Sequence, residues 1–588
     1  MRLTHPTLRF LLGALLPVSS LAGAPRHQCK TIPGDSEWPS PAKWEKFNNT
    51  LEGRLLQPVP PAAVCHAKQA TFDSGRCQNV TEAWSDWAFH VEDPISMVWN
   101  QFTNDTCLPG PKYPCSPEGY PAYVVNATTA EHVRLSINFA RKHNIRLNVK
   151  NTGHDYLGRS NAPNSLSIWV HHMQDVEVHT DGFKPKGCNV TIHGSAVTAG
   201  PGTMLEKLYD SLDAYNLTIV GGNGRTVGIA GYVTGGGHSP LSPRYGLGAD
   251  NVLEVEMVVP SGDIITVNEY SHPDLFWAGG GSTFGVITSI TLRSYETPKV
   301  VGMRYMMMTD HTQPEMYDIA AYILGELPRL GDEGVSGSIN VMADRPNPAP
   351  APGTPDRISG MVGYLMVQDT TDPNTLLDLW KPVNDTINKR WPGAVKLFVE
   401  QITTHDSYRD FIQGFYDERE GGVNQYTTSR LLDNNALTSD PEALSKAARG
   451  VAGVGIGLSV FLVSGKGVHQ VDIRGGGNAV NPGWRSSYAL ALAYVPFSPL
   501  NETARLEAEI HINEIVEPFR KLSHSTGSYL NEAFPYEPNW QQAFWGDNYE
   551  RLVEVKRSVD PDDVFWCFTC VGSEAWSEVD GRILKGPV

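Results

Sequence analysis

The sequence predicts an α+β protein that combines a glycine-rich α/β region with a second region of strands and covering helices. Its 588 residues are enough for two compact domains. From about residue 116, helical and strand-like apolar spacings alternate around glycine-rich turns. From about residue 299 the chain changes to strand-like runs and longer helical runs, which indicates a separate domain.

The composition is that of a globular protein with a negative net charge. Hydrophobic residues make up 40% of the chain and charged residues 19%, which argues against a largely disordered or fibrous protein. There are 47 Lys and Arg against 64 Asp and Glu, a formal net charge of −17. That sign argues against binding to nucleic acid or to an anionic membrane surface.

The first residues have the pattern of a secretory signal peptide. Arg2 and Arg9 precede an apolar run at 10–16, and Ala22-Gly-Ala24 resembles a cleavage site. Residues 1–24 are therefore the predicted leader. The run is too short to span a bilayer, and no later run of about 18 apolar residues exists. We therefore expect a protein without a membrane span that is secreted or resides in the secretory pathway or vacuole. Eight Asn-x-Ser/Thr sites suit glycosylation there: Asn48, Asn79, Asn104, Asn126, Asn189, Asn216, Asn384 and Asn501.

Five of the eight cysteines lie in residues 25–115, a range without clear periodicity. In an oxidising compartment this predicts an irregular extension held by disulfides, whose pairing stays open. Cys567-Phe-Thr-Cys570 is a C-x-x-C motif, for which a redox dithiol and half of a zinc site are the alternatives to a structural disulfide. No second C-x-x-C and no H-E-x-x-H accompany it, so we expect a disulfide and no metal.

The elements of the first region can be placed in order. A helix at 131–143 precedes a strand at 145–149, the turn NTGHDYLGRS at 151–160 and a strand at 166–170. Further strands are expected at 252–259 and 264–267, around the turn Pro260–Asp263. Between these groups lies the stretch IVGGNGRTVGIAGYVTGGGHSPLSPRYG, residues 219–246, with nine glycines.

In the second region, strands are predicted at 303–308 and 358–367. Helices are predicted at 314–327, with Pro314 at the start and Pro328 as the stop, and at 506–522. The Pro-rich stretch at 346–355 predicts a surface loop. Together these elements indicate an antiparallel sheet with helical cover.

Closely spaced glycines let backbone N–H groups approach an anion, so the stretch at 219–246 can line a pyrophosphate. Three common motifs are absent. No G-x-x-x-x-G-K-[ST] P-loop occurs, the spacing of Gly222, Gly224 and Gly228 does not fit G-x-G-x-x-G, and no G-x-S-x-G elbow exists.

The combination of motifs resembles the vanillyl-alcohol-oxidase superfamily of FAD enzymes, in particular the berberine-bridge-enzyme-like oxidoreductases. The motifs are the turn Asn151–Asp155, VGIAGYVTGGGHSPLSPRYGLGADNV at 227–252, DLFWAGGGSTFGVIT at 274–288, SYLNEAFPYEPNW at 528–540 and GDNYERLVEVKRSVDPDDVFW at 546–566. The cysteine-rich start and the ending CFTCVGSEAW are most similar to secreted fungal members of the isoamyl-alcohol-oxidase-like branch.

The resemblance implies a PCMH-type FAD-binding domain of two subdomains at 116–298. It also implies an antiparallel-sheet substrate domain at 299–524 and a C-terminal segment, 525–588, that returns to the FAD domain.

The resemblance also implies roles for individual residues. His154 corresponds to the histidine bonded to the 8α-methyl group of FAD, a reaction that suits a neutral, nucleophilic imidazole. Gly224 stands where many relatives have a second tethering cysteine, so a single covalent bond is expected. Val227 occupies a position at which valine favours oxidases over dehydrogenases. The other implied FAD contacts are Lys150, Asn151, Thr152, Gly153, Asp155, Gly221, Thr226, Gly228, Gly231, Gly235, Gly236, Gly285, Ile287, Asn531 and Asn548.

Tyr529 is the candidate catalytic base, because it matches the first residue of the Tyr-x-Asn-Tyr motif of relatives; the alternative is a tyrosine that serves only in packing. The second tyrosine of that motif is Glu532 here. A tyrosine has an ordinary pKa near 10, so Tyr529 needs a nearby cation or hydrogen bonds to act as a base. For His238 in GGGHS there are two interpretations, a residue that faces the cofactor and a hydrogen-bonded loop histidine, and we expect the second.

The implied activity is a secreted FAD-dependent oxidase acting on a small organic substrate, with O₂ reduced to H₂O₂. An alcohol, such as an intermediate of fungal secondary metabolism, is the leading substrate class. A carbohydrate oxidase, an oxidative cyclase and a flavin-binding glycoprotein without catalysis are the alternatives. The sequence leaves the substrate and the oligomeric state open.

Overall fold

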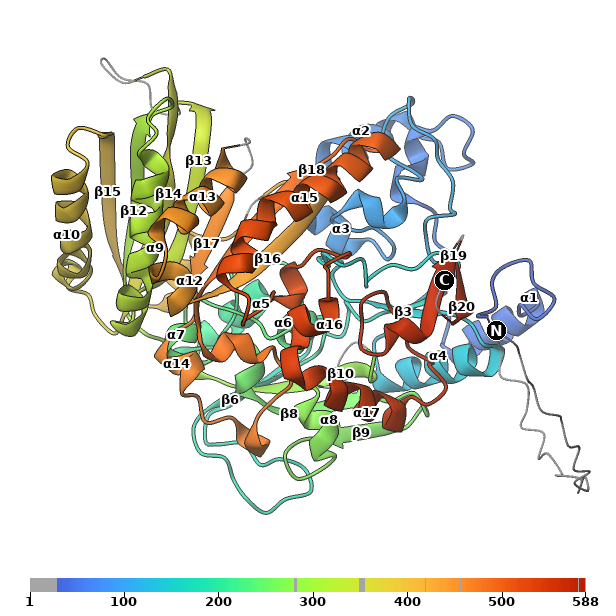
Figure 1. Cartoon of the computed structure of the whole chain (residues 1–588). Helices are drawn as coiled ribbons and strands as arrows, with labels where there is room; N and C mark the ends of the chain where they lie inside the picture. Colours follow the sequence, from blue (N-terminus) through green and yellow to red (C-terminus); the bar gives the residue numbers. More distant parts are fainter. Residues whose placement is uncertain are drawn as a thin grey trace, which may run out of the picture.

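A computed structural model describes residues 29–279, 283–347, 355–417, 419–453, 457–579 and 581–586. The predicted signal peptide, 1–24, and most of the predicted loop at 346–355 lie outside these ranges. The chain folds into two sheets of the glycine-rich region, a large third sheet and a C-terminal segment that packs back on the first two (Figure 1).

A four-stranded sheet forms the first half of the glycine-rich region. In spatial order its strands are β1 (Leu55–Leu56), β2 (Tyr123–Asn126), β4 (Leu166–Trp169) and β3 (Leu147–Lys150). β4 pairs in parallel with β2 and with β3. Helix α4 (Ala130–His143) buries Val133 and Ile137 against this sheet, and Thr129 caps its start by accepting from the His132 N–H. The helix and strands expected at 131–170 are therefore present to within two residues.

A five-stranded antiparallel sheet forms the second half. Its strands, in spatial order, are β5 (Val176–His179), β6 (Ala196–Ala199), β10 (Val286–Arg293), β8 (Val252–Val258) and β9 (Ile264–Val267). Helices α5 (Leu205–Asp213), α6 (Ile229–Thr234), α7 (Ser242–Tyr245) and α8 (Pro273–Trp277) accompany it, together with the strand pair β7 (Leu217–Thr218) and β11 (Tyr295–Glu296). The strands expected at 252–259 and 264–267 are β8 and β9.

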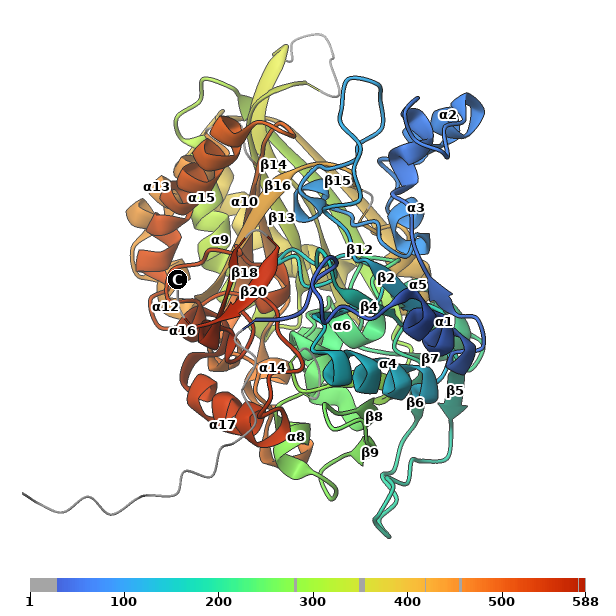
Figure 2. The ribbon, with the colours of Figure 1, turned by 90° about the vertical axis from the view of Figure 1, so that its right-hand side faces the viewer.

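A seven-stranded antiparallel sheet dominates the second region. Its spatial order is β15 (Val395–His405), β12 (Val300–Asp310), β14 (Arg357–Gln368), β13 (Ser336–Pro346), β17 (Leu458–Leu462), β18 (Ser487–Pro496) and β16 (Gln425–Asp433). The helices α9 (Met316–Asp332), α10 (Pro373–Arg390), α12 (Asn434–Thr438), α13 (Pro441–Ala452) and α15 (Glu502–Leu522) share one apolar core with it, and Figure 2 shows α9, α13 and α15 beside the sheet. This is the expected antiparallel sheet with helical cover.

One helix boundary was predicted incorrectly. Pro328 was expected to stop the helix that starts near Pro314, but α9 continues to Asp332 with Pro328 inside it. A proline inside a helix removes one backbone hydrogen bond without always ending the helix. Buried Leu327 and Leu330 on either side of Pro328 pack into the core, which compensates for that loss.

The opposite side of the large sheet faces the glycine-rich region. Leu431 of β16 and Leu490 of β18 form a cluster with Leu247 and Tyr529. The Ser528 hydroxyl also donates to the Ser429 carbonyl at 2.7 Å. These contacts place the Tyr529 motif at the junction of the two regions.

The N-terminal extension is more regular than predicted. It contains α1 (Pro41–Thr50), α2 (Ser74–Ala83) and α3 (Trp87–Glu92), and β1 joins the first sheet. Asp73 and Asp86 cap α2 and α3 by accepting from backbone N–H groups. The helices are short, so their apolar residues do not make a visible period. The structure contains the disulfides Cys65–Cys77, Cys107–Cys115 and Cys567–Cys570.

The C-terminal segment contains α16 (Trp540–Trp545), α17 (Tyr549–Val559), β19 (Trp576–Val579) and β20 (Arg582–Lys585). The Lys30 N–H donates to the Ile583 carbonyl at 3.0 Å, so both ends of the described chain meet at β20 (Figure 1). The remaining helices, α11 (Tyr408–Gln413) and α14 (Lys466–His469), are short. Among the described residues, no helix combines the length and apolar character needed to cross a membrane.

Candidate active site

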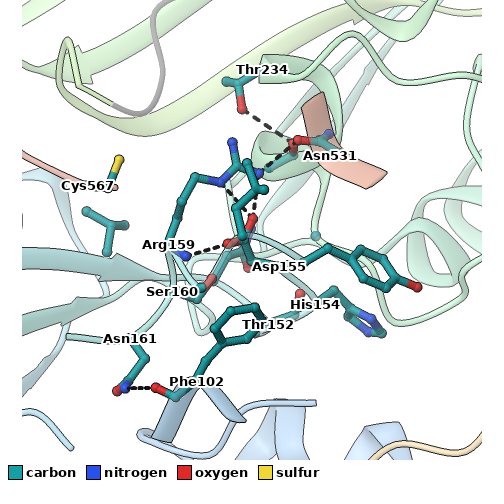
Figure 3. Close-up of a pocket in the computed structure, with 18 of the residues that line it drawn as sticks. Phe102, Thr152, His154, Asp155, Arg159, Ser160, Asn161, Thr234, Asn531 and Cys567 are labelled. Atoms are coloured by element: carbon teal, nitrogen blue, oxygen red, sulfur yellow. Dashed lines mark hydrogen bonds and ion pairs between the residues drawn. The ribbon is translucent and has the colours of Figure 1, made fainter. Parts of the chain in front are cut away.

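A cavity of about 640 Å³ lies where the glycine-rich region, Asp417 with Arg419, and the C-terminal segment meet. Its size is in the range of small-molecule and cofactor sites. Figure 3 shows His154, Asp155, Arg159 and Asn531 around it. Of the residues predicted to contact FAD or substrate, those on its wall are Asn151, Thr152, Gly153, His154, Asp155, Val227, Gly228, Gly231, Gly285, Ile287, Tyr529 and Asn531.

The other predicted contacts are not among the residues that line the cavity: Lys150, Gly221, Thr226, Gly235, Gly236 and Asn548. Lys150 points away from the cavity, and its Nζ donates to the Asp93 carbonyl at 2.8 Å and the His90 carbonyl at 3.2 Å. Burial lowers the pKa of Lys150 to about 8. The Asn548 side chain donates to the Val480 carbonyl at 2.9 Å. Both side chains therefore support neighbouring backbone segments in this structure.

His154 connects the two glycine-rich turns. Its Nε2 lies 2.7 Å from the Thr226 hydroxyl, and the Trp87 ring of α3 contacts it edge-on at 4.7 Å between centroids. Burial lowers the pKa of His154 to about 3, with the charge of Lys150 acting in the same direction. The imidazole is therefore neutral at physiological pH, which is the nucleophilic form.

A chain of polar contacts runs from the first turn to the Tyr529 motif. Arg159 pairs with Asp155, with Nε 2.7 Å from Oδ1, and its Nη2 donates to Asn531 Oδ1 at 3.0 Å (Figure 3). Asn531 Nδ2 lies 3.0 Å from the Tyr529 hydroxyl. The orientation of Tyr529 is therefore tied to the first turn through Arg159.

Two glycines allow side chains to approach the backbone of the second turn. A Cβ at Gly228 would lie 2.2 Å from Asn151 Nδ2, and one at Gly235 would lie 2.2 Å from Asn531 Oδ1. Both distances are far below van der Waals contact. Gly231 differs, because it lines the cavity and, outside its own helix and its chain neighbours, no described atom lies within 4 Å of its Cβ position.

Tyr529 is buried, and its hydroxyl lies 3.3 Å from the Gly237 N–H in addition to the Asn531 contact. Burial raises the pKa of Tyr529, and the nearby Glu532 carboxylate raises it further. The cation that a tyrosine base needs does not contact it among the described residues: Arg159 reaches it only through Asn531. His238 lines the cavity, with Nε2 3.4 Å from both carboxylate oxygens of Glu532.

Sequence reasoning missed several wall residues. Asp417 and Arg419 form an ion pair at 2.5 Å, and Arg419 Nη2 lies 3.3 Å from the Tyr156 hydroxyl. Trp87 comes from the extension that was predicted to be irregular. None of these positions belongs to a motif that the sequence shows, because the fold brings them in from distant segments.

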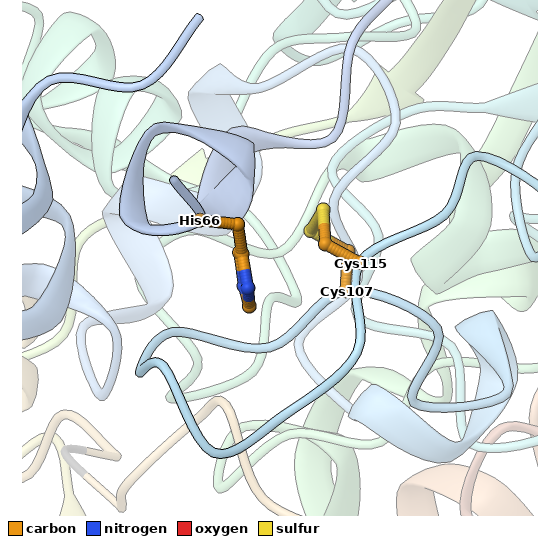
Figure 4. A group of neighbouring side chains, drawn as sticks. All are labelled: His66, Cys107 and Cys115. Atoms are coloured by element: carbon orange, nitrogen blue, oxygen red, sulfur yellow. A yellow bond between two sulfur atoms is a disulfide. The ribbon is translucent and has the colours of Figure 1, made fainter. Parts of the chain in front are cut away.

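Among the described residues, two clusters outside the cavity have the residue types of a metal site: one is Glu92 with His171 and His172, and the other surrounds His66. His66 lies beside Cys107 and Cys115 (Figure 4), but the two cysteines are bonded to each other. The His66 Nε2 lies 2.9 Å from the Leu108 carbonyl. The disulfide offers no thiolate to a metal, so this cluster is structural.

Comparisons with known proteins agree with this geometry. The family model described as "FAD binding domain" matches residues 121–268, and that described as "Berberine and berberine like" matches residues 528–569. The FAD-linked oxidoreductase ZEB1 of Gibberella zeae is 32% identical and covers 98% of both chains. The VAO-type flavoprotein oxidase VAO615 of Thermothelomyces thermophilus is 33% identical and covers 95% of both. The crystal structure of the VAO-type flavoprotein MtVAO713 from Myceliophthora thermophila has a TM-score of 0.88 at 29% identity, covering 95% of this chain and 100% of that one.

The fold and the cavity define an FAD-linked oxidoreductase of the vanillyl-alcohol-oxidase type. Within this class, the chain belongs to the berberine-bridge-enzyme-like family. The family and the α+β fold class predicted from the sequence are thereby confirmed.

The wall of the cavity suits FAD chemically. The buried Oδ1 atoms of Asn151 and Asn161 have no hydrogen-bond partner among the described residues, so both can accept from the hydroxyl or amino groups of a ligand. Gly231 leaves open space in the second turn, and neutral His154 lies between the turns. These features fit a large ligand with both polar and aromatic parts.

Proposed function

We propose that the protein is a secreted oxidase that holds FAD through one covalent bond to His154. It would oxidise a small organic alcohol, with O₂ as the electron acceptor. The observation that carries this proposal is the position of His154. Its ring lies on the cavity wall, is kept neutral by burial, and is oriented by Thr226 and Trp87.

The residues around His154 would hold FAD along the cavity. Bound there, FAD supplies the acceptor for a hydride from the substrate and transfers the electrons to O₂. Thr152 and Gly153 of the first turn, with Gly228 and Gly231 of the second, would surround the pyrophosphate. Gly285 and Ile287 of the third glycine motif would lie along the adenosine half.

A single tether is supported by Gly224. It lies on the cavity wall, and a Cβ there would be 2.8 Å from Val227 Cγ2. The position offers no thiol, so His154 is the nucleophile that the two glycine-rich turns present.

The end of the cavity near Tyr529 has the character of a substrate site. Tyr156, Tyr232 and Tyr529 supply aromatic surface, and His238 and Glu532 supply polar groups. Such a mixture suits an organic molecule with an apolar body and a hydroxyl group. The name of the relative VAO615, a flavoprotein oxidase, supports O₂ as the electron acceptor.

Acid precipitation of the purified protein tests the tether. We expect yellow flavin to stay with the wild-type pellet and to be released into the supernatant from a His154→Ala variant. Free flavin from the wild-type protein would contradict a covalent bond. Anaerobic mixing with panels of alcohols, sugars and phenols should bleach the flavin with an alcohol, and admitting air should restore its colour and yield H₂O₂.

A further inference from the structure

Four carboxylate side chains lie on the wall of the cavity: Asp155, Asp417, Glu532 and Glu578. Three of them are paired with arginines, and the pairs are Asp155 with Arg159, Asp417 with Arg419, and Glu578 with Arg146. An arginine stays charged at any physiological pH and stabilises the charged form of its partner. The oxygens of these three carboxylates are therefore already engaged by a guanidinium group.

Glu532 is the exception among the described wall residues, because its ion-pair partner is a histidine. His238 Nε2 lies 3.4 Å from both Oε1 and Oε2, so the ring faces the carboxylate symmetrically. The Trp484 ring stacks on His238 at 6.2 Å between centroids, and the Tyr529 ring meets it edge-on at 5.1 Å. A histidine can gain and lose a proton near neutral pH, which an arginine cannot.

Tyr529 is placed to donate a hydrogen bond. Its hydroxyl oxygen lies within reach of two N–H donors, from Gly237 and Asn531, which leaves its own O–H free for a third group. Because burial and the Glu532 charge raise its pKa, the phenol keeps its proton. Glu532 lies three residues further along the chain, and an ionised carboxylate can accept a proton or a hydrogen bond.

We propose that Glu532 accepts the hydroxyl proton of the substrate, with His238 as its positioning residue and Tyr529 as a hydrogen-bond donor to the same substrate oxygen. This inference rests on the proposed alcohol oxidation. As the carbon–oxygen double bond forms, the O–H proton passes to Glu532 and the hydride of the adjacent C–H bond passes to FAD. Glu532 then returns its proton to solvent by way of His238, and O₂ takes up two electrons and two protons to give H₂O₂.

The charged and titratable groups around Glu532 come from several elements. His238 follows α6, Tyr529 precedes Glu532, Tyr156 lies in the first turn, and Arg419 comes from the second region. Tyr232 of α6 also interacts electrostatically with Glu532. Arg419 also interacts electrostatically with Glu532, but its ion-pair partner is Asp417.

The test uses the flavin-loaded protein and the alcohol that bleaches the wild-type flavin fastest. We expect Glu532→Gln to slow anaerobic bleaching by about 10²- to 10⁴-fold, the usual loss of a general base. Its flavin content and the rate at which O₂ reoxidises dithionite-reduced enzyme should stay as in the wild type. Glu532→Asp should restore part of the rate, which a purely structural defect would not allow.

The pH profile separates the roles of the three residues. In wild type, the bleaching rate should fall at low pH as the proton acceptor, Glu532, becomes protonated. This acid limb of the pH profile should disappear in Glu532→Gln and shift to a different pH in His238→Gln. Tyr529→Phe should reduce the rate but keep the limb. Glu177→Gln is the matched control, because Glu177 lies 3.9 Å from His179 on β5, remote from the cavity, and should leave the profile unchanged.

The outcomes distinguish this inference from the proposed function. If Glu532→Gln keeps the wild-type rate and limb while Tyr529→Phe loses both, Tyr529 is the base and the inference is wrong. If neither wild-type nor variant flavin is bleached by any alcohol in the panel, the proposed function itself fails.

Discussion

The Nε2 atom of His154 lies 2.7 Å from the Oγ1 atom of Thr226, and this contact joins the two glycine-rich turns of the cavity. Thr226 itself does not line the cavity, so its effect on a ligand passes through His154. With Nε2 engaged by the hydroxyl, Nδ1 is the ring nitrogen left for a new bond. Under the proposed bond between His154 and FAD, this contact would make Thr226 a positioning residue for flavin attachment.

Replacing Thr226 by valine should therefore slow the covalent incorporation of FAD. Loss of one hydrogen bond worth about 0.5–1.5 kcal/mol corresponds to about a twofold to tenfold slower attachment. The measurement is in-gel flavin fluorescence over time after FAD is added to apoprotein. Thr198→Val is the matched control, since Thr198 Oγ1 lies 2.8 Å from His179 Nε2 away from the cavity. Equal rates in the two variants would contradict the role of Thr226.

Gly231 offers a test of where the cofactor lies. A leucine there should abolish most FAD binding, because Gly231 lines the cavity and the space at its Cβ position is open, so the new side chain would occupy the site. The free energy of unfolding of the apoprotein should change little, since leucine is a better helix former than glycine. Flavin absorbance per protein measures the loss. Gly450→Leu is the control, because Gly450 is also helical with open space at its Cβ position and lies far from the cavity wall; it should keep full flavin content.

The sequence predicted the parts of the fold that depend on local pattern. Apolar spacing predicts the strands and helix at 131–170 and the large antiparallel sheet. The glycine-rich turns were predicted from their sequence motifs. The approach of Trp87 to His154, and of Arg419 to Tyr156, depends on packing between segments more than 60 residues apart, which no local pattern encodes. Lys150 lies next to a motif, and its Nζ donates to the His90 and Asp93 carbonyls, so its contact with FAD stays a prediction.

A buried ion cluster holds the C-terminal segment against the large sheet. Glu537 is fully buried and accepts from Arg430 of β16 at 2.6 Å and from Arg520 of α15 at 2.9 Å. Glu537→Gln leaves two arginines without a countercharge, so the free energy of unfolding should fall by about 3–5 kcal/mol. Urea denaturation followed by tryptophan fluorescence measures it. Glu442→Gln removes an exposed partner of Lys446 and should have no measurable effect. A similarly small effect at Glu537 would show that the cluster is not stabilising.

His90 should make the stability of the protein depend on pH. It is fully buried, with Nε2 2.7 Å from the Trp84 carbonyl and Nδ1 2.6 Å from the Ser96 hydroxyl. The carbonyl can only accept, so Nε2 carries the proton of the neutral ring and Nδ1 accepts from Ser96. Burial lowers the pKa of His90 to about 4, against an ordinary value near 6.5.

Above pH of about 6.5 the ring is neutral in both states and contributes no pH dependence. Between about 6.5 and 4 the unfolded chain binds a proton that the folded protein does not, so stability falls as pH falls. From pH 7 to pH 5 this one group should lower the free energy of unfolding by about 2 kcal/mol. Urea denaturation at the two pH values measures the free energy of unfolding. In His90→Gln, its loss between pH 7 and pH 5 should be smaller than in wild type by that amount, whereas a variant of the exposed His172, His172→Gln, should behave as wild type. If His90→Gln loses as much stability as the wild type, proton uptake by other groups accounts for the pH dependence.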